Sequence, residues 1–246
     1  MNLTLSPKFI FFCLTISFLF KDNTVFAQLK ESKYGVFYVD TRYYYDSSVK
    51  ADPALLLTDI RSLLPTVRYD LRYAGNNNFT GMVLYPSDTR YSFLALPALN
   101  GLVKAAEVFD SLGYDLVIFD AYRPYSITIR FWELIQNEDY VARPTKGSMH
   151  NRGLAVDLTL WDRKLNRLVD MGTDFDHFSD TAHHSFSNLP ESVLQNRLLL
   201  KNTLEQFGFK PIATEWWHYV WQTTTVYPVL DIDFNTLYAI QKKYSK

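Results

Sequence analysis

The sequence predicts a single domain of the α+β class. A chain of 246 residues that is 48% hydrophobic and 16% aromatic can bury one sizeable core. Helical patterns are interspersed with short apolar strand patterns, without the regular strand and helix alternation that is typical of a doubly wound parallel sheet. No internal repeat, low-complexity tract or linker divides the chain after residue 27.

Residues 1–27 have the pattern of a secretory signal peptide. Lys8 supplies the positive start, residues 9–20 form an apolar run, and residues 25–27 offer small side chains for cleavage before Gln28. The apolar run is too short for a helix that spans the ~30 Å core of a bilayer, so no stable membrane insertion is expected after cleavage. We therefore expect an exported protein, either periplasmic or secreted.

Cys13, the only cysteine, lies inside this signal segment. Its removal leaves no thiol, which excludes disulfides and thiolate metal ligands, so any metal must be held by histidine and carboxylate side chains. The formal net charge of -1 gives no electrostatic reason to expect nucleic acid or an acidic membrane as a partner. A small ligand is the better expectation.

Residues 28–56 are expected to form an N-terminal extension, and the tyrosines of its RYYYDSS stretch to pack on the surface of a domain that spans residues 57–246. The first strong helical pattern covers residues 97–113. Pro97 suits a first helical turn, apolar residues recur at helical spacing, and Gly113 can end the helix.

The next segment, YDLVIFDAYRP (residues 114–124), is predicted to be a buried strand that ends in polar side chains where the chain must turn. Further helices are predicted over residues 126–136 and 191–209, the latter ending at Gly208. TEWWHYVWQ (residues 214–222) is short and aromatic, which favours a strand.

The stretch GSMHNRGLAVDLTL (residues 147–160) places His150 on a turn and Asp157 within a strand. Gly153 allows a sharp reversal that brings both side chains to one point. A helix would also put residues seven apart on one face, but the β-favouring residues after Gly153 argue for the strand. Taken alone, the pair also fits a loop histidine and a turn-forming aspartate.

EWWH adds Glu215 and His218, three residues apart among tryptophans. Two imidazoles and one carboxylate are typical protein ligands of a catalytic zinc that keeps an open position for water, and a further glutamate can take a proton from that water. The sequence supplies such a set. Taken alone, EWWH also fits an aromatic strand at an interface.

Together, SMHNRGLAVDLTL and the EWWH about sixty residues later resemble the zinc signature of the VanX-type D-alanyl-D-alanine dipeptidases of peptidase family M15. Three more segments resemble that family, and the similarity covers roughly residues 57–222. They are DLRYAGNNNFTG (residues 70–81), FDAYRP (residues 119–124) and DMGTDFD (residues 170–176). The resemblance implies a central, mainly antiparallel sheet flanked by helices, as in the hedgehog and D,D-peptidase fold.

The resemblance also implies one Zn²⁺ per chain, held by His150, Asp157 and His218. Glu215 is then the general base that later protonates the leaving amine, and Arg123 stabilises the oxyanion of the tetrahedral intermediate.

An alternative for Arg123 is a salt bridge at the strand end, to Asp120 or Asp115. A free dipeptide also needs partners for its two charged ends.

For the substrate ammonium, Asp176 is the candidate and Asp174 a rival in the same loop. Ser148 either contacts the terminal carboxylate or caps its own turn. His183 and His184 resemble a histidine pair of the family, and we expect them to support the site or the fold without binding zinc.

The predicted activity is hydrolysis of D-Ala-D-Ala or similar D,D-dipeptides in cell-wall peptide turnover. A D,D-carboxypeptidase or L,D-endopeptidase with a more open cleft is one alternative. Others are a binding module that keeps zinc without turnover, which Glu215 and Arg123 argue against, and a purely structural metal, which the open ligand position argues against. Export favours scavenging of D-alanine over interception of a cytoplasmic dipeptide. The sequence does not determine the oligomeric state.

Overall fold

The computed structural model describes residues 29–138 and 140–244, so the predicted signal peptide and Cys13 lie outside the described residues. Its central sheet has the strand order β4-β6-β7-β10-β9, and β8 pairs with β7. These strands are β4 (Arg68–Tyr69), β6 (Tyr114–Asp120), β7 (Ala155–Asp162), β8 (Arg167–Leu168), β9 (Phe209–Ile212) and β10 (Glu215–Trp221). All pairs are antiparallel except β4 with β6. The predicted α+β class and mainly antiparallel sheet are confirmed.

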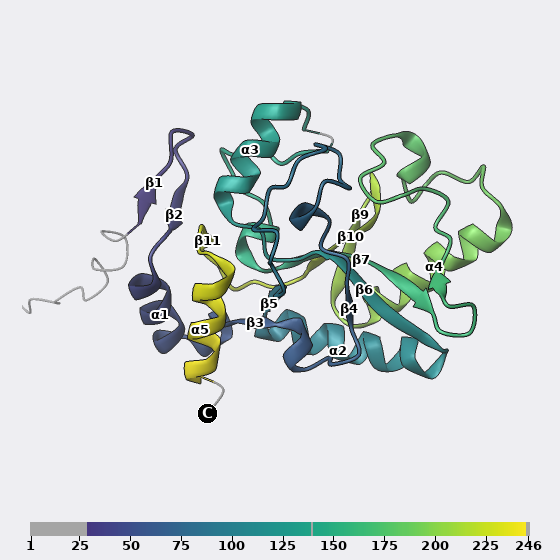
Figure 1. Ribbon diagram of the computed structural model, residues 1–246, viewed down its shortest axis with the longest axis horizontal. Coiled ribbons are helices and arrows are strands. Elements are labelled where there is room, and N and C mark those ends of the chain that lie inside the picture. The colour runs from purple at the N-terminus through teal and green to yellow at the C-terminus, as the bar shows by residue number, and fades with distance from the viewer. Residues whose placement is uncertain (1–28, 139, 245–246) are drawn as a thin grey trace, which may run out of the picture.

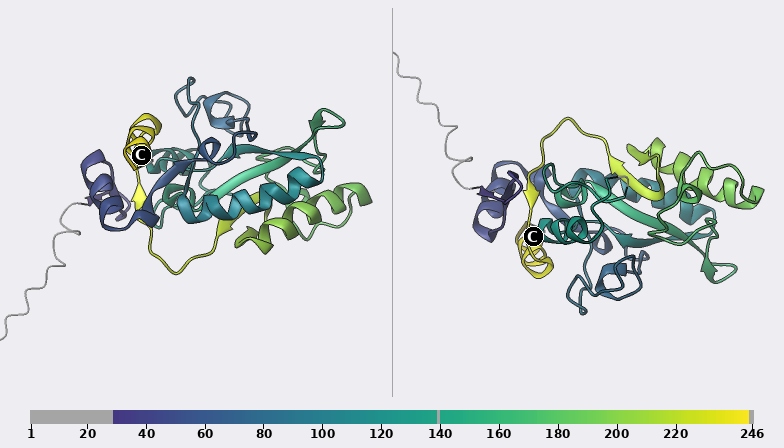
Figure 2. Two further views of the ribbon diagram at one scale, coloured as in Figure 1. Left: turned by 90° about the horizontal axis from the view of Figure 1, so that it is seen from below. Right: turned by 90° about the horizontal axis from the view of Figure 1, so that it is seen from above.

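Three helices occupy the segments where the sequence predicts them: α2 (Leu96–Ser111), α3 (Tyr125–Ile135) and α4 (Glu191–Gln206). Helices α2 and α4 pack against each other and against the sheet, so that they lie side by side along it (Figure 2). The buried residues of α2 recur three or four apart, as in Ala98, Leu102 and Ala105. Gly113 and Gly208 follow the last turns of α2 and α4 with φ of +91° at each, a conformation that favours glycine.

The N-terminal extension and the C-terminal segment form one further layer at the side of the domain (Figure 1). It contains β1 (Lys30–Glu31), β2 (Phe37–Val39), α1 (Arg42–Ala51), the 3₁₀ turn η3 (Pro53–Leu55), β11 (Val229–Leu230) and α5 (Phe234–Tyr244). Strand β2 pairs with both β1 and β11, and α1 contacts α5. The two ends of the described chain therefore support each other.

One tyrosine of the extension lies deeper than the surface packing that the sequence suggests. Tyr45 is 1% exposed, and its hydroxyl accepts a hydrogen bond from the Leu57 amide (2.6 Å) and donates one to the Leu55 carbonyl (3.1 Å). Because the ring is buried with its hydroxyl satisfied, it joins the extension to the main core. Tyr43, by contrast, is exposed.

The remaining short elements surround the sheet. They are the paired strands β3 (Leu57–Asp59) and β5 (Phe93–Ala95), and the 3₁₀ turns η4 (Ile60–Ser62), η5 (Arg72–Ala74), η6 (His150–Arg152) and η7 (Asp180–Ala182). Among residues 29–138 and 140–244, no helix has the length and apolarity needed to cross a membrane.

Strands β6, β7 and β10 are adjacent, and this order brings distant residues together. Asp157 of β7 pairs in register with Asp120 of β6 and with His218 of β10. His150 lies on η6, directly before β7. Gly153 makes the reversal between them with φ of +66°, and a Cβ there would lie 2.3 Å from Leu57 Cδ2, so this turn requires glycine.

Candidate metal centre and active site

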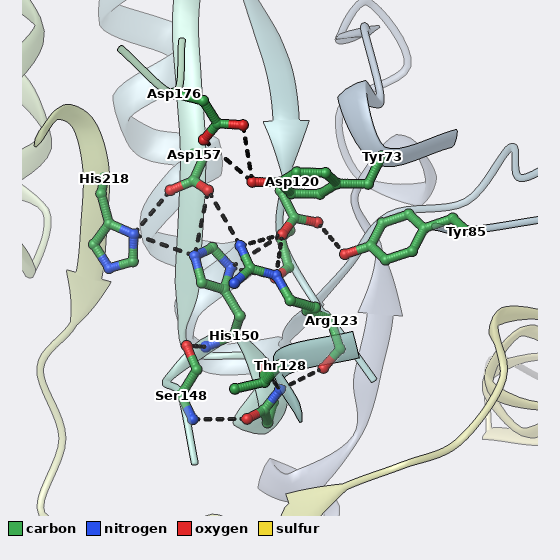
Figure 3. A network of polar contacts seen from close by, with 12 residues as sticks. Tyr73, Tyr85, Asp120, Arg123, Thr128, Ser148, His150, Asp157, Asp176 and His218 are labelled. Carbon is green, nitrogen blue, oxygen red and sulfur yellow. Dashed lines mark hydrogen bonds and ion pairs between the residues drawn. The ribbon is translucent and has the colours of Figure 1, made fainter. Parts of the chain in front are cut away.

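Three side chains point their ligand atoms at one place, as Figure 3 shows. His150 Nε2 lies 3.2 Å from His218 Nδ1 and 3.4 Å from Asp157 Oδ2, and His218 Nδ1 lies 2.8 Å from Asp157 Oδ1. Zinc held tetrahedrally at about 2.0 to 2.2 Å would place its ligand atoms roughly 3.3 to 3.6 Å apart. The two separations from His150 Nε2 are close to that range. The contacts of Asp157 with the two rings use different carboxylate oxygens, so one oxygen would have to face both rings to act as the zinc ligand.

The orientation of His150 suits a metal ligand. Its Nδ1 lies 2.6 Å from the Ala121 carbonyl oxygen, so Nδ1 carries the proton and donates it there. Nε2 is then the ring nitrogen that a metal can use, and it faces Asp157 and His218. A backbone acceptor that holds the ring this way is the usual support of a metal-binding histidine.

The electrostatics of Asp157 also suit a cation. Burial disfavours the charge of this carboxylate, but in the metal-free protein charge interactions and hydrogen bonds with His150 and His218 outweigh burial and lower the pKa of Asp157. An anionic oxygen and two ring nitrogens, with His150 and Asp157 buried and His218 partly exposed, form a donor set that fits zinc.

Glu215 begins β10 and lies beside this trio without belonging to it. Its Oε2 is 3.9 Å from His218 Nδ1, and the residue is 7% exposed. Burial, with the nearby Asp157 charge, raises the pKa of Glu215 to about 8 in the metal-free protein. The carboxylate therefore binds a proton readily, which is what a general acid and base needs.

Arg123 follows the end of β6 and is 8% exposed. Its Nε donates to Asp120 Oδ2 (2.8 Å), its Nη2 lies 3.7 Å from Asp157 Oδ2, and its guanidinium lies 4.6 Å from the Phe131 ring centre. The salt bridge to Asp120 that the sequence offers as an alternative is present. The same guanidinium nevertheless faces the trio, so the two interpretations do not exclude each other.

Asp120 is itself held in place, because its Oδ1 accepts a hydrogen bond from the Tyr85 hydroxyl at 2.7 Å. Asp115, the other partner considered for Arg123, binds Arg68 and Arg163 instead. Asp120 and Tyr85 therefore fix the arginine; the sequence offered Asp120 as its partner and gave no signal for Tyr85.

The site opens into a cavity of about 300 Å³ whose lining includes Arg123, Ser148, Asp176 and Glu215. Both carboxylate oxygens of Asp176 accept from the Tyr73 hydroxyl, at 3.2 and 3.1 Å. Burial, and then the charge of Asp157, raise the pKa of Asp176. Asp174 is exposed and lines a neighbouring cavity, so the structure brings only Asp176 of the two rivals to this pocket.

Ser148 lines the pocket and also caps its turn, since its Oγ accepts from the His150 amide at 3.2 Å. Asn151 holds the same turn. Its Oδ1 accepts from the Ser148 amide (2.7 Å), and its Nδ2 donates to the Arg123 carbonyl (2.9 Å). The only sequence signal for Asn151 was its place next to His150, and it was not singled out.

His183 and His184 are not part of the pocket lining. The His184 amide donates to the Ala213 carbonyl at 3.0 Å, which ties their loop to the turn before β10. Burial, and then the positive charges of Lys201 and Arg197, lower the pKa of His184 to about 4. The pair lies with the supporting structure and away from the metal trio.

Comparison with known proteins identifies the family. The family model described as D-ala-D-ala dipeptidase, Peptidase_M15, matches residues 54–235. The chain belongs to this peptidase family. The D-alanyl-D-alanine dipeptidase of Escherichia coli (strain K12) is 35% identical over 179 residues, which cover 73% of this chain and 91% of the relative. That of Enterococcus faecium is 31% identical over 181 residues, 66% of this chain and 90% of the relative.

Solved structures are more distant from this member of the M15 family. The structure described as VanYB in complex with D-Alanine-D-Alanine has 14% sequence identity and a TM-score of 0.37, and the match covers 68% of this chain and 89% of that one.

Proposed function

We propose that this M15 peptidase hydrolyses D-Ala-D-Ala or closely similar D,D-dipeptides in cell-wall peptide turnover, with one zinc ion per chain. The observation that carries the proposal is the cavity of about 300 Å³ that contains the His150, Asp157 and His218 trio together with Glu215, Arg123 and Asp176. A metal site, a base, a cation and an anion thus meet in one small space. Relatives named D-alanyl-D-alanine dipeptidase support the choice of substrate.

His150, Asp157 and His218 would hold the zinc. When bound, zinc supplies a Lewis acid that polarises the scissile carbonyl and lowers the pKa of water at its open position. Glu215 takes the proton of the attacking water and passes it to the leaving amine, because its carboxylate lies in the pocket and is easily protonated.

Arg123 meets the negative charge that develops on the carbonyl oxygen. Its guanidinium is held by Asp120 and stacked on Phe131, so little reorganisation is needed when that charge appears. The partial neutralisation by Asp120 keeps this buried cation tolerable in the free enzyme.

The two ends of the dipeptide find opposite partners. Asp176, with the Tyr73 hydroxyl beside it, receives the ammonium. The Ser148 hydroxyl, whose Oγ is available to donate while it accepts from the His150 amide, receives the terminal carboxylate.

We further propose that residues 1–27 are a signal peptide, that residues 28–56 form an extension to the zinc domain of residues 57–246, and that the enzyme is periplasmic or secreted. Lys8 followed by the apolar residues 9–20 supports the signal peptide and export. Export in turn favours the recovery of D-alanine from wall turnover.

One assay tests the proposed activity. Purified protein, with and without a chelator, is incubated with D-Ala-D-Ala, L-Ala-L-Ala and a muropeptide that ends in D-Ala-D-Ala. Chelator-sensitive cleavage of free D-Ala-D-Ala alone is the expected result. Cleavage of the muropeptide but not the dipeptide would replace the proposal with a carboxypeptidase or endopeptidase, and zinc binding without any cleavage would indicate a binding module.

A further inference from the structure

A second cavity, of about 370 Å³, lies beside the catalytic pocket. Thr159 lines it and stands two residues after Asp157 on β7, so the two side chains project from the same face of the sheet. Residues 168–175 form one wall, and Asp176, which follows directly, lines the catalytic pocket. Neither zinc chemistry nor dipeptide binding uses this second cavity.

The buried part of the cavity carries hydrogen-bond donors. Thr159 is 2% exposed, and its Oγ1 has no hydrogen-bond partner among the described residues. Arg72 is 8% exposed, and its guanidinium lies 4.7 Å from the Phe119 ring centre while Nε donates to Asp70 Oδ2 at 2.8 Å. The guanidinium is thereby held flat, and its Nη groups are suited to a carboxylate. A buried hydroxyl without a partner costs free energy, which a bound ligand would recover.

The exposed part of the cavity carries the opposite charge. Asp170 and Asp174 are both exposed there, and Asp170 Oδ1 accepts from the Gly172 amide at 2.8 Å, which orients its carboxylate. Trp216 forms an apolar wall and is fixed by a hydrogen bond from Nε1 to Thr173 Oγ1 at 2.8 Å. The cavity therefore offers donors inside, carboxylates outside and an aromatic surface between them.

We propose that this cavity binds a free α-amino acid. The ligand carboxylate lies against Arg72 and Thr159, and its ammonium lies between Asp170 and Asp174. Asp70 holds only Nε of Arg72, so the cavity still has donors at its buried end and two carboxylates at its exposed end, which match a zwitterion better than a simple anion or a simple amine. The volume is at the small end of ligand pockets, which span about 300 to 1,000 Å³.

The inference goes beyond the proposed hydrolysis, whose products are free amino acids, and it does not depend on turnover. The two cavities are nevertheless adjoining. Tyr73 and Asp176, which are proposed to receive the dipeptide ammonium in the catalytic pocket, each follow a residue that lines the second cavity. Arg72 precedes Tyr73 in η5, and Phe175 precedes Asp176.

Two tryptophans report on the cavities, because Trp216 lines the second cavity and Trp217 lines the catalytic one. Their ring centres lie 5.4 Å apart, so variants are needed to assign a movement to one cavity. Protein labelled with 5-fluorotryptophan is titrated with D-alanine, L-alanine, acetate and ethylamine, and ¹⁹F resonances are assigned by Trp216→Phe and Trp217→Phe. We expect saturable movement of the Trp216 resonance with at least one alanine enantiomer. Acetate and ethylamine should bind roughly tenfold more weakly or worse, since each satisfies only one end.

Variants decide which cavity causes the movement. Arg72→Met and the nearly isosteric Thr159→Val should each weaken it, whereas Asp176→Asn, which alters only the catalytic pocket, should leave it. Arg68→Met is the control, because Arg68 also lies over an aromatic ring (4.5 Å from the Trp161 ring centre) and pairs with an aspartate, Asp115, but lines neither cavity.

Two results would overturn the proposal. One is a Trp216 resonance that stays unmoved at alanine concentrations that saturate the movement of the Trp217 resonance. The other is a Trp216 resonance that moves equally in Thr159→Val and in the wild type. The measurement needs neither metal nor catalysis. A protein that binds alanine at Trp216 but cleaves no dipeptide would therefore refute the proposed function and keep this inference. A protein that cleaves the dipeptide but binds no alanine at Trp216 would keep the proposed function and refute this inference.

Discussion

Replacement of Glu215 by glutamine separates a base from a metal ligand. Glu215 is 7% exposed and lies 3.9 Å from His218 Nδ1, outside the trio that would hold zinc. Glutamine keeps the shape of the side chain and removes only the basic carboxylate. We therefore expect Glu215→Gln to bind zinc like the wild type and to lose proton transfer.

The size of both effects follows from the site. General acid and base catalysis contributes about 10²- to 10⁴-fold, or roughly 3 to 5 kcal/mol of barrier, and the loss should fall on kcat because substrate binding needs no proton transfer. The free energy of unfolding of the metal-free protein, by contrast, should increase in Glu215→Gln. Burial raises the pKa of Glu215 to about 8 in the metal-free protein, so stability is lost as the pH rises from the unfolded value of 4.5 towards 8.

Glutamine removes that loss, so metal-free Glu215→Gln should be more stable than the metal-free wild type at pH 7, by up to about 3 kcal/mol. The assays are steady-state kinetics, metal analysis and urea unfolding of the metal-free proteins. Glu205→Gln is the control, because Glu205 is an exposed glutamate of α4 that pairs with Lys201. A kcat near that of the wild type would refute the role of Glu215 as the base, and loss of zinc would make it a ligand.

Four further outcomes are expected. His218→Ala should lose most bound zinc and nearly all activity, and stoichiometric zinc in that variant would contradict the ligand assignment. Asp176→Asn should raise KM for D-Ala-D-Ala by roughly 10- to 100-fold through loss of a charged hydrogen bond, whereas Asp174→Asn should stay near wild type; equal effects in both would remove Asp176 from the ammonium site. Mass spectrometry of the exported protein should find its N-terminus at or near Gln28 and activity indifferent to reductant, and full-length protein retained in the cytosol would contradict export. Burial lowers the pKa of His184 to about 4, so the free energy of unfolding of the wild type should fall by about 2 kcal/mol between pH 7 and pH 5, and His184→Gln should lack this decrease. Urea unfolding measures it, and an identical decrease in both proteins would show that His184 is solvated in the native state.

The local elements of this domain could be predicted from the sequence where one physical signal dominates. Helices α2 and α4 carry long helical patterns and end near Gly113 and Gly208, whose φ of +91° other residues rarely adopt. Helices α1 and α5 escaped prediction. In α1 only Tyr45 and Val49 are buried, so its pattern is weak, and it is stabilised by contact with α5 from the far end of the chain.

For the site, the sequence by itself determined which residues could bind a metal. The two histidines, the aspartate and the spare glutamate lie in two short motifs, and short motifs can be recognised in a sequence without its structure. Only the tertiary structure decided how the other residues are used. It brings Asp176 to the catalytic pocket and Asp174 to the cavity beside it, although they are two positions apart in the sequence. It also gives Arg123 both Asp120 and the metal trio as neighbours. These choices depend on the direction of each side chain and on partners tens of residues away, such as Tyr73 for Asp176, and a local pattern contains neither.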